Sequence, residues 1–369
     1  MEFLPSGTEV RSYDLVDVVE GVPMESFSAK RFDGGGHVIG IASSHPSSTG
    51  GYSGVRFSYD IMGRQSGQTN PSEINDPKGV EVSNWTPTGD DAPVGWQWTR
   101  QSYDWKGRPT ITNHADGRIR QVSYGGCGCA GKEVMTVTDE GGRVQKSYQD
   151  VFGRVEKNEA LNPDGSVYQS AVSLYNARDQ ITFLREYKGA AVEASCPTNT
   201  CKETARTYDG HGRLFTLKRP EQARPIKYSY NPDDTINTVE DPRGVILTNS
   251  YDVRHLVEKM VYTVPNDPAT GLPNASIPSA ATVEFAYDEA GNRRLMKDGM
   301  GQVTYTHNTL SQLKSEKRFF TDLASTQSGG NYTIEYDYNL VGALKSIKDP
   351  FNRINYAYNE AGQLKTIKG

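Results

Sequence analysis

The sequence lacks several features that define large classes of proteins. No apolar run approaches the roughly 18 residues of a membrane-spanning helix, so no such helix is expected. The start of the chain has no basic segment followed by an apolar stretch, so no signal peptide is visible. Four cysteines in 369 residues exclude a disulfide-dense scaffold. A formal charge of −5 argues against a protein that coats nucleic acid, because phosphate contacts need clustered Lys and Arg.

Apolar residues are also scarce, at 35% of the chain with Tyr included. Counting the 37 Gly in place of the 21 Tyr gives about 39%, against roughly 45–50% in globular domains. Aromatic residues nevertheless reach 10%, which is too many for a disordered chain. We therefore expect an ordered protein with a thin core, in which Gly serves turns and Tyr serves cross-strand contacts.

Motifs of catalysis, metal binding and phosphate binding are missing as well. The six histidines are scattered without the spacing of metal ligands. Neither a phosphate-binding G-x-x-x-x-G-K-[ST] nor a G-x-S-x-G nucleophile elbow occurs. The sequence therefore predicts no metal site, no cofactor and no enzymatic activity.

A short unit recurs along the chain: Tyr, then Asp or Asn, two variable residues, Gly, and often Arg. It is clearest as YDIMGR, YDWKGR, YDGHGR and YDEAGN, and weaker copies such as YNPDDT and HNTLSQ lie 20–22 residues from a neighbour. The residues of the clearest copies are Tyr59, Asp60, Gly63, Arg64, Tyr103, Asp104, Gly107, Arg108, Tyr208, Asp209, Gly212, Arg213, Tyr287, Asp288 and Gly291. A catalytic constellation is normally unique, so a pair that recurs in every unit indicates a structural role.

The unit has the composition of a turn followed by a strand. Asp can cap the turn with its own carboxylate, Gly tolerates a positive φ, and Arg can pack along a neighbouring Tyr ring. A second turn signal, such as EDPRG or KDPFN, lies about halfway along each unit. Between turns, residues alternate with the period of a strand. The sequence predicts an all-β fold of tandem antiparallel hairpins, one per roughly 20 residues.

This repeat, with Asp-x-x-Gly turns between its copies, resembles the YD repeats of bacterial RHS proteins over residues 59–369. The stretch YGGCGCAG at 124–131 is similar to a subset of large RHS proteins of soil bacteria. Residues 1–58, with RSYDLVDVVEG around Tyr13, are predicted to form an entry segment with one degenerate repeat. The resemblance implies a hairpin strip that curves or spirals into a shell wall around a C-terminal toxic domain.

On this resemblance, we interpret the chain as a structural wall segment of a secreted or cell-surface RHS-type protein. Its expected partners are the remaining shell and a cargo or toxin domain that this sequence does not contain, with neither nucleic acid nor a membrane span. Two alternatives stay open: a cell-surface carbohydrate-binding or adhesion protein, and, less favoured, a glycan-cleaving enzyme with two carboxylates. The last repeat, from Tyr358, looks like its interior neighbours, so we expect an open strand edge that pairs with more shell.

The cysteines form two close pairs. Cys127 and Cys129 flank one Gly, and Cys196 and Cys201 flank a Pro-containing insertion. In an oxidising compartment, the first choice for a disulfide is Cys196 with Cys201. The C-x-C spacing of the first pair fits a tetrathiolate zinc site poorly. Cys127 and Cys129 are also candidates for a disulfide, and a metal site and free structural thiols remain the alternatives.

All four tryptophans, Trp85, Trp96, Trp98 and Trp105, fall within 21 residues. An exposed cluster of aromatic rings could stack on sugars. The favoured interpretation is a packed corner or plug of the shell.

Overall fold

The computed structural model describes residues 2–3, 9–19, 22–46, 48–126, 133–191, 196–197, 199–323, 330–359 and 362–369. These residues form 29 β-strands and three short 3₁₀-helices, with no α-helix in the described part. The predicted all-β fold of tandem antiparallel hairpins is confirmed. No helix in the described ranges is both long and apolar enough to span a membrane.

The chain divides into two compact units, Met1–Ile119 with Phe285–Gly369, and Arg120–Glu284. We call them unit 1 and unit 2. The predicted boundary between residues 58 and 59 stays a prediction.

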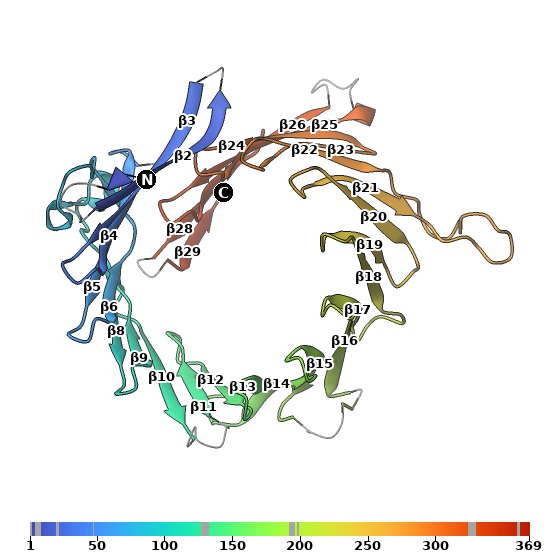
Figure 1. Cartoon of the computed structure of the whole chain (residues 1–369), viewed down its shortest axis with the longest axis horizontal. Coiled ribbons are helices and arrows are strands. Elements are labelled where there is room, and N and C mark those ends of the chain that lie inside the picture. The colour runs from blue at the N-terminus through green and yellow to red at the C-terminus, as the bar shows by residue number, and fades with distance from the viewer. Residues whose placement is uncertain are drawn as a thin grey trace. The chain divides into compact units, whose positions relative to one another are not determined.

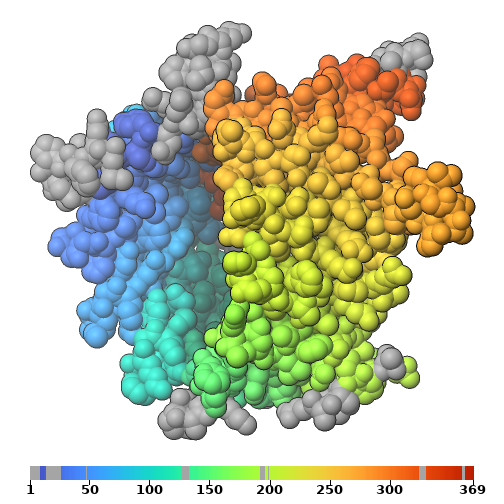
Figure 2. Space-filling model, turned by 45° about the vertical axis from the view of Figure 1, so that its right-hand side comes forward, coloured from blue at the N-terminus to red at the C-terminus, as the bar shows by residue number. Residues whose placement is uncertain are grey.

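Unit 2 is a ladder in which consecutive strands pair. Its strands are β10 (Ile119–Gly125), β11 (Val134–Thr138), β12 (Val144–Gln149), β13 (Val155–Leu161), β14 (Val167–Tyr175), β15 (Ile181–Lys188), β16 (Cys201–Tyr208), β17 (Leu214–Lys218), β18 (Ile226–Tyr230), β19 (Ile236–Glu240), β20 (Ile246–Tyr251), β21 (Val257–Thr263) and β22 (Val283–Tyr287). Each pairs antiparallel with the next strand in sequence (Figure 1). Figure 2 shows its side chains, coloured green through yellow, as one continuous surface.

Unit 2 is one strand layer thick, and its described residues bury little. Those that are fully buried are Ser170, Tyr187, Cys201 and Val245. The thin core expected from the low apolar content is therefore seen directly in this unit. Its stability rests on the backbone ladder and on contacts between neighbouring strands, because few side chains are removed from water.

Unit 1 contains a first stretch with a longer insertion and a later stretch of simple hairpins. The first has β1 (Glu2–Phe3), β2 (Glu9–Val19), β3 (Val22–Phe32), β4 (Val38–Ser44), β5 (Tyr52–Tyr59), β6 (Gln65–Thr69), β7 (Ser72–Ile74), β8 (Trp98–Tyr103) and β9 (Pro109–Asn113), with 3₁₀-helices at Val82–Asn84 and Gly89–Asp91. The later has β23 (Arg293–Asp298), β24 (Gly301–His307), β25 (Leu313–Phe320), β26 (Asn331–Tyr338), β27 (Leu344–Lys348), β28 (Arg353–Tyr358) and β29 (Leu364–Lys368), with a 3₁₀-helix at Thr321–Leu323.

From β1 to β5, each strand of the first stretch pairs with the next strand in sequence, and the pairing branches at β5. β5 pairs with both β6 and β7, β6 pairs with β8, and β8 pairs with β9. The later stretch is an unbranched ladder from β23 to β29. All five residues of β29 are exposed.

The hydrophobic core of unit 1 lies under the insertion between β6 and β8. Ile74, Val82 and Trp85 of the insertion pack with Ala42 of β4, and all four are buried. Gly40 permits this approach, because a Cβ there would lie 2.8 Å from both Trp85 and Val82. The insertion therefore acts as a plug that gives this part of the strip a second layer.

Candidate functional site: the Tyr-Asp turn and its contacts

The repeated Tyr-Asp turn is closed by its own Asp side chain. In the copy at residues 59–64, Asp60 Oδ1 accepts hydrogen bonds from the backbone amides of Met62 and Arg64, both at 2.9 Å. Arg64 Nε donates to the other carboxylate oxygen, Oδ2, at 2.7 Å. The hydrogen bond from the Arg64 amide is the largest cause that holds the pKa of Asp60 below its usual value. The carboxylate is thus engaged by its own turn.

The other strong copies repeat this geometry. Asp104 and Asp209 each accept from the backbone amide and Nε of the Arg four residues later, at 2.8–2.9 Å. Asp288 accepts from the backbone and side-chain amides of Asn292 instead. Gly63, Gly107, Gly212 and Gly291 have φ between 74° and 86°, the left-handed conformation that glycine adopts most easily.

In eight copies of the repeat, the Tyr hydroxyl links its turn to the preceding one. Tyr103 donates to the carbonyl of Gln65, the first residue after the preceding turn, and Tyr208 donates to Ile181 O in the same way. The further pairs are Tyr59 with Val38, Tyr175 with Val155, Tyr230 with Leu214, Tyr251 with Ile236, Tyr338 with Leu313 and Tyr358 with Leu344, at 2.7–2.9 Å. One bond of the same kind therefore connects turn to turn along the strip.

The Arg of one turn lies against the Tyr of the next. Arg213 places its guanidinium 4.5 Å from the centre of the Tyr230 ring, and Arg64 lies 4.7 Å from that of Tyr103. Arg213 also donates to Asp234 in the following turn at 2.6 Å. The Arg therefore contacts its own Asp, the next Tyr and the next turn. Its packing along a neighbouring Tyr ring was expected from the sequence, whereas its bond to the next turn was not.

Four weak copies of the repeat form the same turn without Gly. Asp179, Asp234, His255 and Ser311 occupy the Gly position with φ between 57° and 66°. All four are among the copies that match the repeat less well in sequence. A missed turn of the same kind lies at residues 33–37, where His37 takes the Arg position and stacks on Tyr59 at 4.7 Å. Its sequence signal was DGGGH, whereas Tyr13 lies inside β2.

The tryptophans separate into buried and exposed positions. Trp85 is 3% exposed and its indole N–H donates to Val80 O, so it offers no ring face to a ligand. Trp96 donates to Trp85 O and packs against the same core. Trp98 is half-buried, and Trp105 is 88% exposed at a turn tip. The four rings do not form one exposed surface.

Cys196 and Cys201 are joined by a disulfide in the connection between β15 and β16. Cys127 and Cys129 lie outside the described residues. Among the residues that the structure does describe, no group of three or more His, Cys, Asp and Glu side chains is placed to hold a metal ion.

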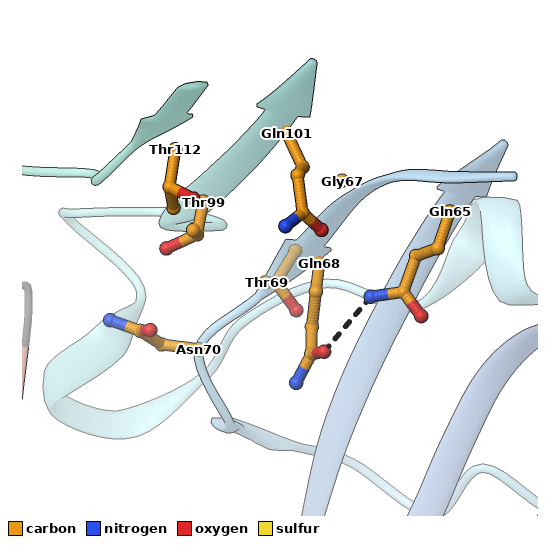
Figure 3. Close-up of a pocket in the computed structure, with 8 residues that line it drawn as sticks. All are labelled: Gln65, Gly67, Gln68, Thr69, Asn70, Thr99, Gln101 and Thr112. Atoms are coloured by element: carbon orange, nitrogen blue, oxygen red, sulfur yellow. Dashed lines mark hydrogen bonds between the residues drawn. The ribbon is translucent and has the colours of Figure 1, made fainter. Parts of the chain in front are cut away.

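A pocket with an uncharged lining lies on strands β6, β8 and β9. Its volume is about 260 Å³, and it is lined by Gln65, Gly67, Gln68, Thr69, Asn70, Thr99, Gln101 and Thr112 (Figure 3). Gln65 Nε2 donates to Gln68 Oε1 at 3.1 Å, as the dashed line shows. Amide and hydroxyl groups can donate and accept hydrogen bonds but supply neither a nucleophile with its base nor an acid pair.

No protein-family model matches the chain, and no curated protein matches it. Among solved structures, it is similar to a chain of the TcdB2-TccC3-Cdc42 crystal structure at 12% identity and a TM-score of 0.49, over 98% of this chain and 23% of that one. The Tc holotoxin pore of Photorhabdus luminescens matches at 16% identity and a TM-score of 0.48, over 93% of this chain and 20% of the other. The chain thus spans about a fifth to a quarter of the chains it matches, and similarity at this level assigns no function.

Proposed function

We propose that this chain is a structural wall segment of an encapsulating β-shell of the RHS type, without catalysis of its own. The observation that carries the proposal is unit 2: a sheet one strand thick, in which each strand pairs with its sequence neighbours and the turns are connected by Tyr–carbonyl bonds. Such a sheet has two accessible faces and little interior, which suits a partition better than an enzyme with a packed core.

The two faces of this wall differ in chemistry. On one face, Tyr228, Val239, Leu247 and Tyr262 form a row across β18 to β21. On the other, Ser229, Thr238 and Thr248 lie in register, and the first two share a 2.6 Å hydroxyl contact. An apolar, aromatic face can hold the exposed apolar segments of a partly unfolded polypeptide, whereas the hydroxyl face suits water. We therefore assign the cargo to the Tyr-bearing face.

Secretion or surface display accompanies this role. The disulfide between Cys196 and Cys201 supports it, because such bonds persist in oxidising compartments. The partners of the wall are further hairpin repeats and the enclosed polypeptide.

Protease protection tests the function on the complete natural polypeptide that contains this chain. We expect the segment outside the repeats to resist limited proteolysis and to become sensitive when Tyr230→Phe and Tyr251→Phe remove two Tyr–carbonyl bonds of the wall, each worth about 0.5–1.5 kcal/mol. Tyr168→Phe, at a position 63% exposed, is the matched control. Digestion of that segment at one rate in all three proteins contradicts the proposal.

A second candidate function, binding of neutral glycans, rests on the pocket of Figure 3. Its uncharged amides and hydroxyls can bond to sugar hydroxyls without selecting for charge. This function predicts binding to a neutral oligosaccharide on a glycan array that Gln101→Ala weakens and Lys106→Ala leaves unchanged. Absence of binding to every neutral glycan on the array eliminates it.

A further inference from the structure

The hairpin strip of unit 1 has two edges made of turns. Because consecutive strands are antiparallel, alternate turns lie on the same edge. One edge carries the Tyr-Asp turns, and we call it the YD edge; the other carries the halfway turns and the plug, and we call it the counter edge. The YD-edge turns include residues 60–64, 104–108, 308–312, 339–343 and 359–363, and the counter-edge segments include 70–97, 114–118, 298–301 and 349–352.

Within unit 1 these two kinds of edge already meet. In the counter-edge turn 114–118, Arg118 Nη1 donates to Gln363 Oε1 in the YD-edge turn 359–363 at 2.7 Å. Asn359 Nδ2 of the same YD-edge turn reaches Asp116 Oδ2 at 3.5 Å. Nearby, the tip residue Val341 and the plug residue Val94 line one cavity of about 410 Å³. The counter edge of the first stretch therefore contacts the YD edge of the later stretch.

The other two edges of unit 1 are the YD edge of the first stretch and the counter edge of the later stretch. Both expose large apolar side chains at their turn tips. On the YD edge of the first stretch, Ile61 is 101%, Met62 73% and Trp105 88% exposed. On the counter edge of the later stretch, Met300 is 58% and Phe351 86% exposed. Turn tips ordinarily carry Gly, Pro, Asn or Asp, and exposed apolar groups of this size mark interaction surfaces.

The apolar tips on the YD edge belong to one surface. Arg64 lies over the Tyr103 ring and donates to Asp104 O at 3.3 Å, so the two turns that bear Ile61, Met62 and Trp105 are direct neighbours. On the counter edge, Phe351 lies 6.4 Å from Tyr332. The YD edge therefore presents one cluster of apolar tips, and the counter edge presents the Phe351–Tyr332 pair together with Met300 on a separate turn.

We propose that these patches bind each other between two copies of the chain, with the YD edge of one copy on the counter edge of the next. The occupant is a second copy because the chain carries both halves of the contact and already joins a YD edge to a counter edge internally. The contact is heterologous, so it leaves one patch of each kind free and builds head-to-tail assemblies. The proposal rests on the hairpin strip and is independent of any cargo.

Sedimentation velocity of the full chain over a concentration series tests this contact. A YD-edge variant carries Ile61→Ser, Met62→Ser and Trp105→Ser, and a counter-edge variant carries Met300→Ser and Phe351→Ser. A control variant with Tyr168→Ser and Phe215→Ser removes exposed apolar side chains away from the turn tips. Circular dichroism melts verify that all variants remain folded.

The wild type and the control are expected to form a concentration-dependent series of oligomers. Either edge variant alone should associate at least about tenfold more weakly. An equimolar mixture of the two edge variants should form dimers and nothing larger, because each supplies the patch that the other has lost. A monomeric wild type, edge variants that associate as the wild type does, or a mixture without dimers overturns the proposal. Association that persists in both edge variants would assign the contact to the exposed strand β29 instead.

Discussion

Two glycines of the turn at residues 209–213 have different backbone conformations. In the turn of residues 209–213, Gly212 has a φ of 86°, and a Cβ on it would lie 3.1 Å from Gln180 Nε2. A Cβ on Gly210, two residues earlier, would meet no atom within 4 Å, and Gly210 has no positive φ. The two glycines therefore form a matched pair within one turn.

We predict that Gly212→Ala lowers the free energy of unfolding by about 1–2 kcal/mol, because the Cβ of alanine is strained in the left-handed backbone conformation. Gly210→Ala should leave it unchanged or raise it by up to about 1 kcal/mol, because the unfolded chain loses freedom. Urea unfolding followed by circular dichroism measures both. Equal effects of the two substitutions would show that backbone conformation is not the determinant.

In turns that lack Gly, a side-chain contact with the neighbouring turn offsets the cost of the positive φ. Asp234 is bonded to Arg213 at 2.6 Å, Ser311 to Asn292 at 3.2 Å, and His255 to Asp233 at 3.0 Å. In each case the residue with positive φ has a side chain that reaches the previous turn, which Gly could not provide. A residue that is unfavourable for its own turn can therefore be favourable for the strip.

At the scale of elements, the plug of residues 70–97 depends on Trp85. We predict that Trp85→Ala destabilises the plug by about 3–5 kcal/mol, because it leaves a cavity among Ala42, Ile74 and Val82. Hydrogen exchange measured by mass spectrometry should show faster exchange in peptides from 70–97. Trp105→Ala, at an exposed tip, is the control and should leave this exchange unchanged. Equal protection in both variants would mean that the Trp85 contact does not hold the plug.

The connection between β15 and β16 depends on its disulfide. Non-reduced peptide mapping of protein produced in an oxidising compartment should recover the Cys196–Cys201 link. Replacement of both cysteines by Ser should lower the free energy of unfolding by about 2 kcal/mol, as expected for a short closed loop. Free thiols at both positions in protein from that compartment would be inconsistent with this bond.

The sequence predicted the hairpins and the packing of Arg on Tyr, but not the carbonyl that each Tyr hydroxyl bonds. Turn residues and strand alternation are local, so the 20-residue period identified the strands from β5 onward. The acceptor of each Tyr lies in the preceding repeat, and its position depends on a register shift beside the Tyr, as between Ser102 and Tyr103. The core around Trp85 joins the plug to β4, a pairing that no local pattern encodes. Tyr13 is followed by Asp as in the repeat, yet it lies inside strand β2 and forms no such turn.

For the molecule as a whole, we expect the turn carboxylates to govern the response to acid. Hydrogen bonds from the backbone amide four residues later are the largest cause that lowers the pKa of Asp60, Asp139 and Asp252 below the ordinary value of 3.8. A carboxyl group with a lowered pKa in the folded state contributes stability above its unfolded pKa. This contribution is lost as the pH falls through the folded value, because the unfolded chain takes up protons first.

We therefore predict that the melting temperature is steady above about pH 5 and falls progressively below about pH 4. Asp139→Asn with Asp252→Asn should reduce this dependence while keeping the turns, because Asn cannot titrate. The chain contains this replacement naturally: Asn339 Oδ1 accepts from the Ala343 amide at 2.8 Å. Thermal melts from pH 7 to about pH 2.5 measure the effect. An acid transition of unchanged slope in the double variant would show that other groups control it.

The Tyr–carbonyl bond also bears on how the gene can change. Each bond reaches only the preceding turn, as from Tyr230 to Leu214 and from Tyr251 to Ile236. Unequal recombination that duplicates or deletes one complete unit would leave every remaining Tyr with an equivalent acceptor. Insertion or deletion of only part of a unit would instead move the Tyr and its Arg away from the residues that they contact. Lineages of this protein can therefore differ in repeat number far more easily than in repeat length.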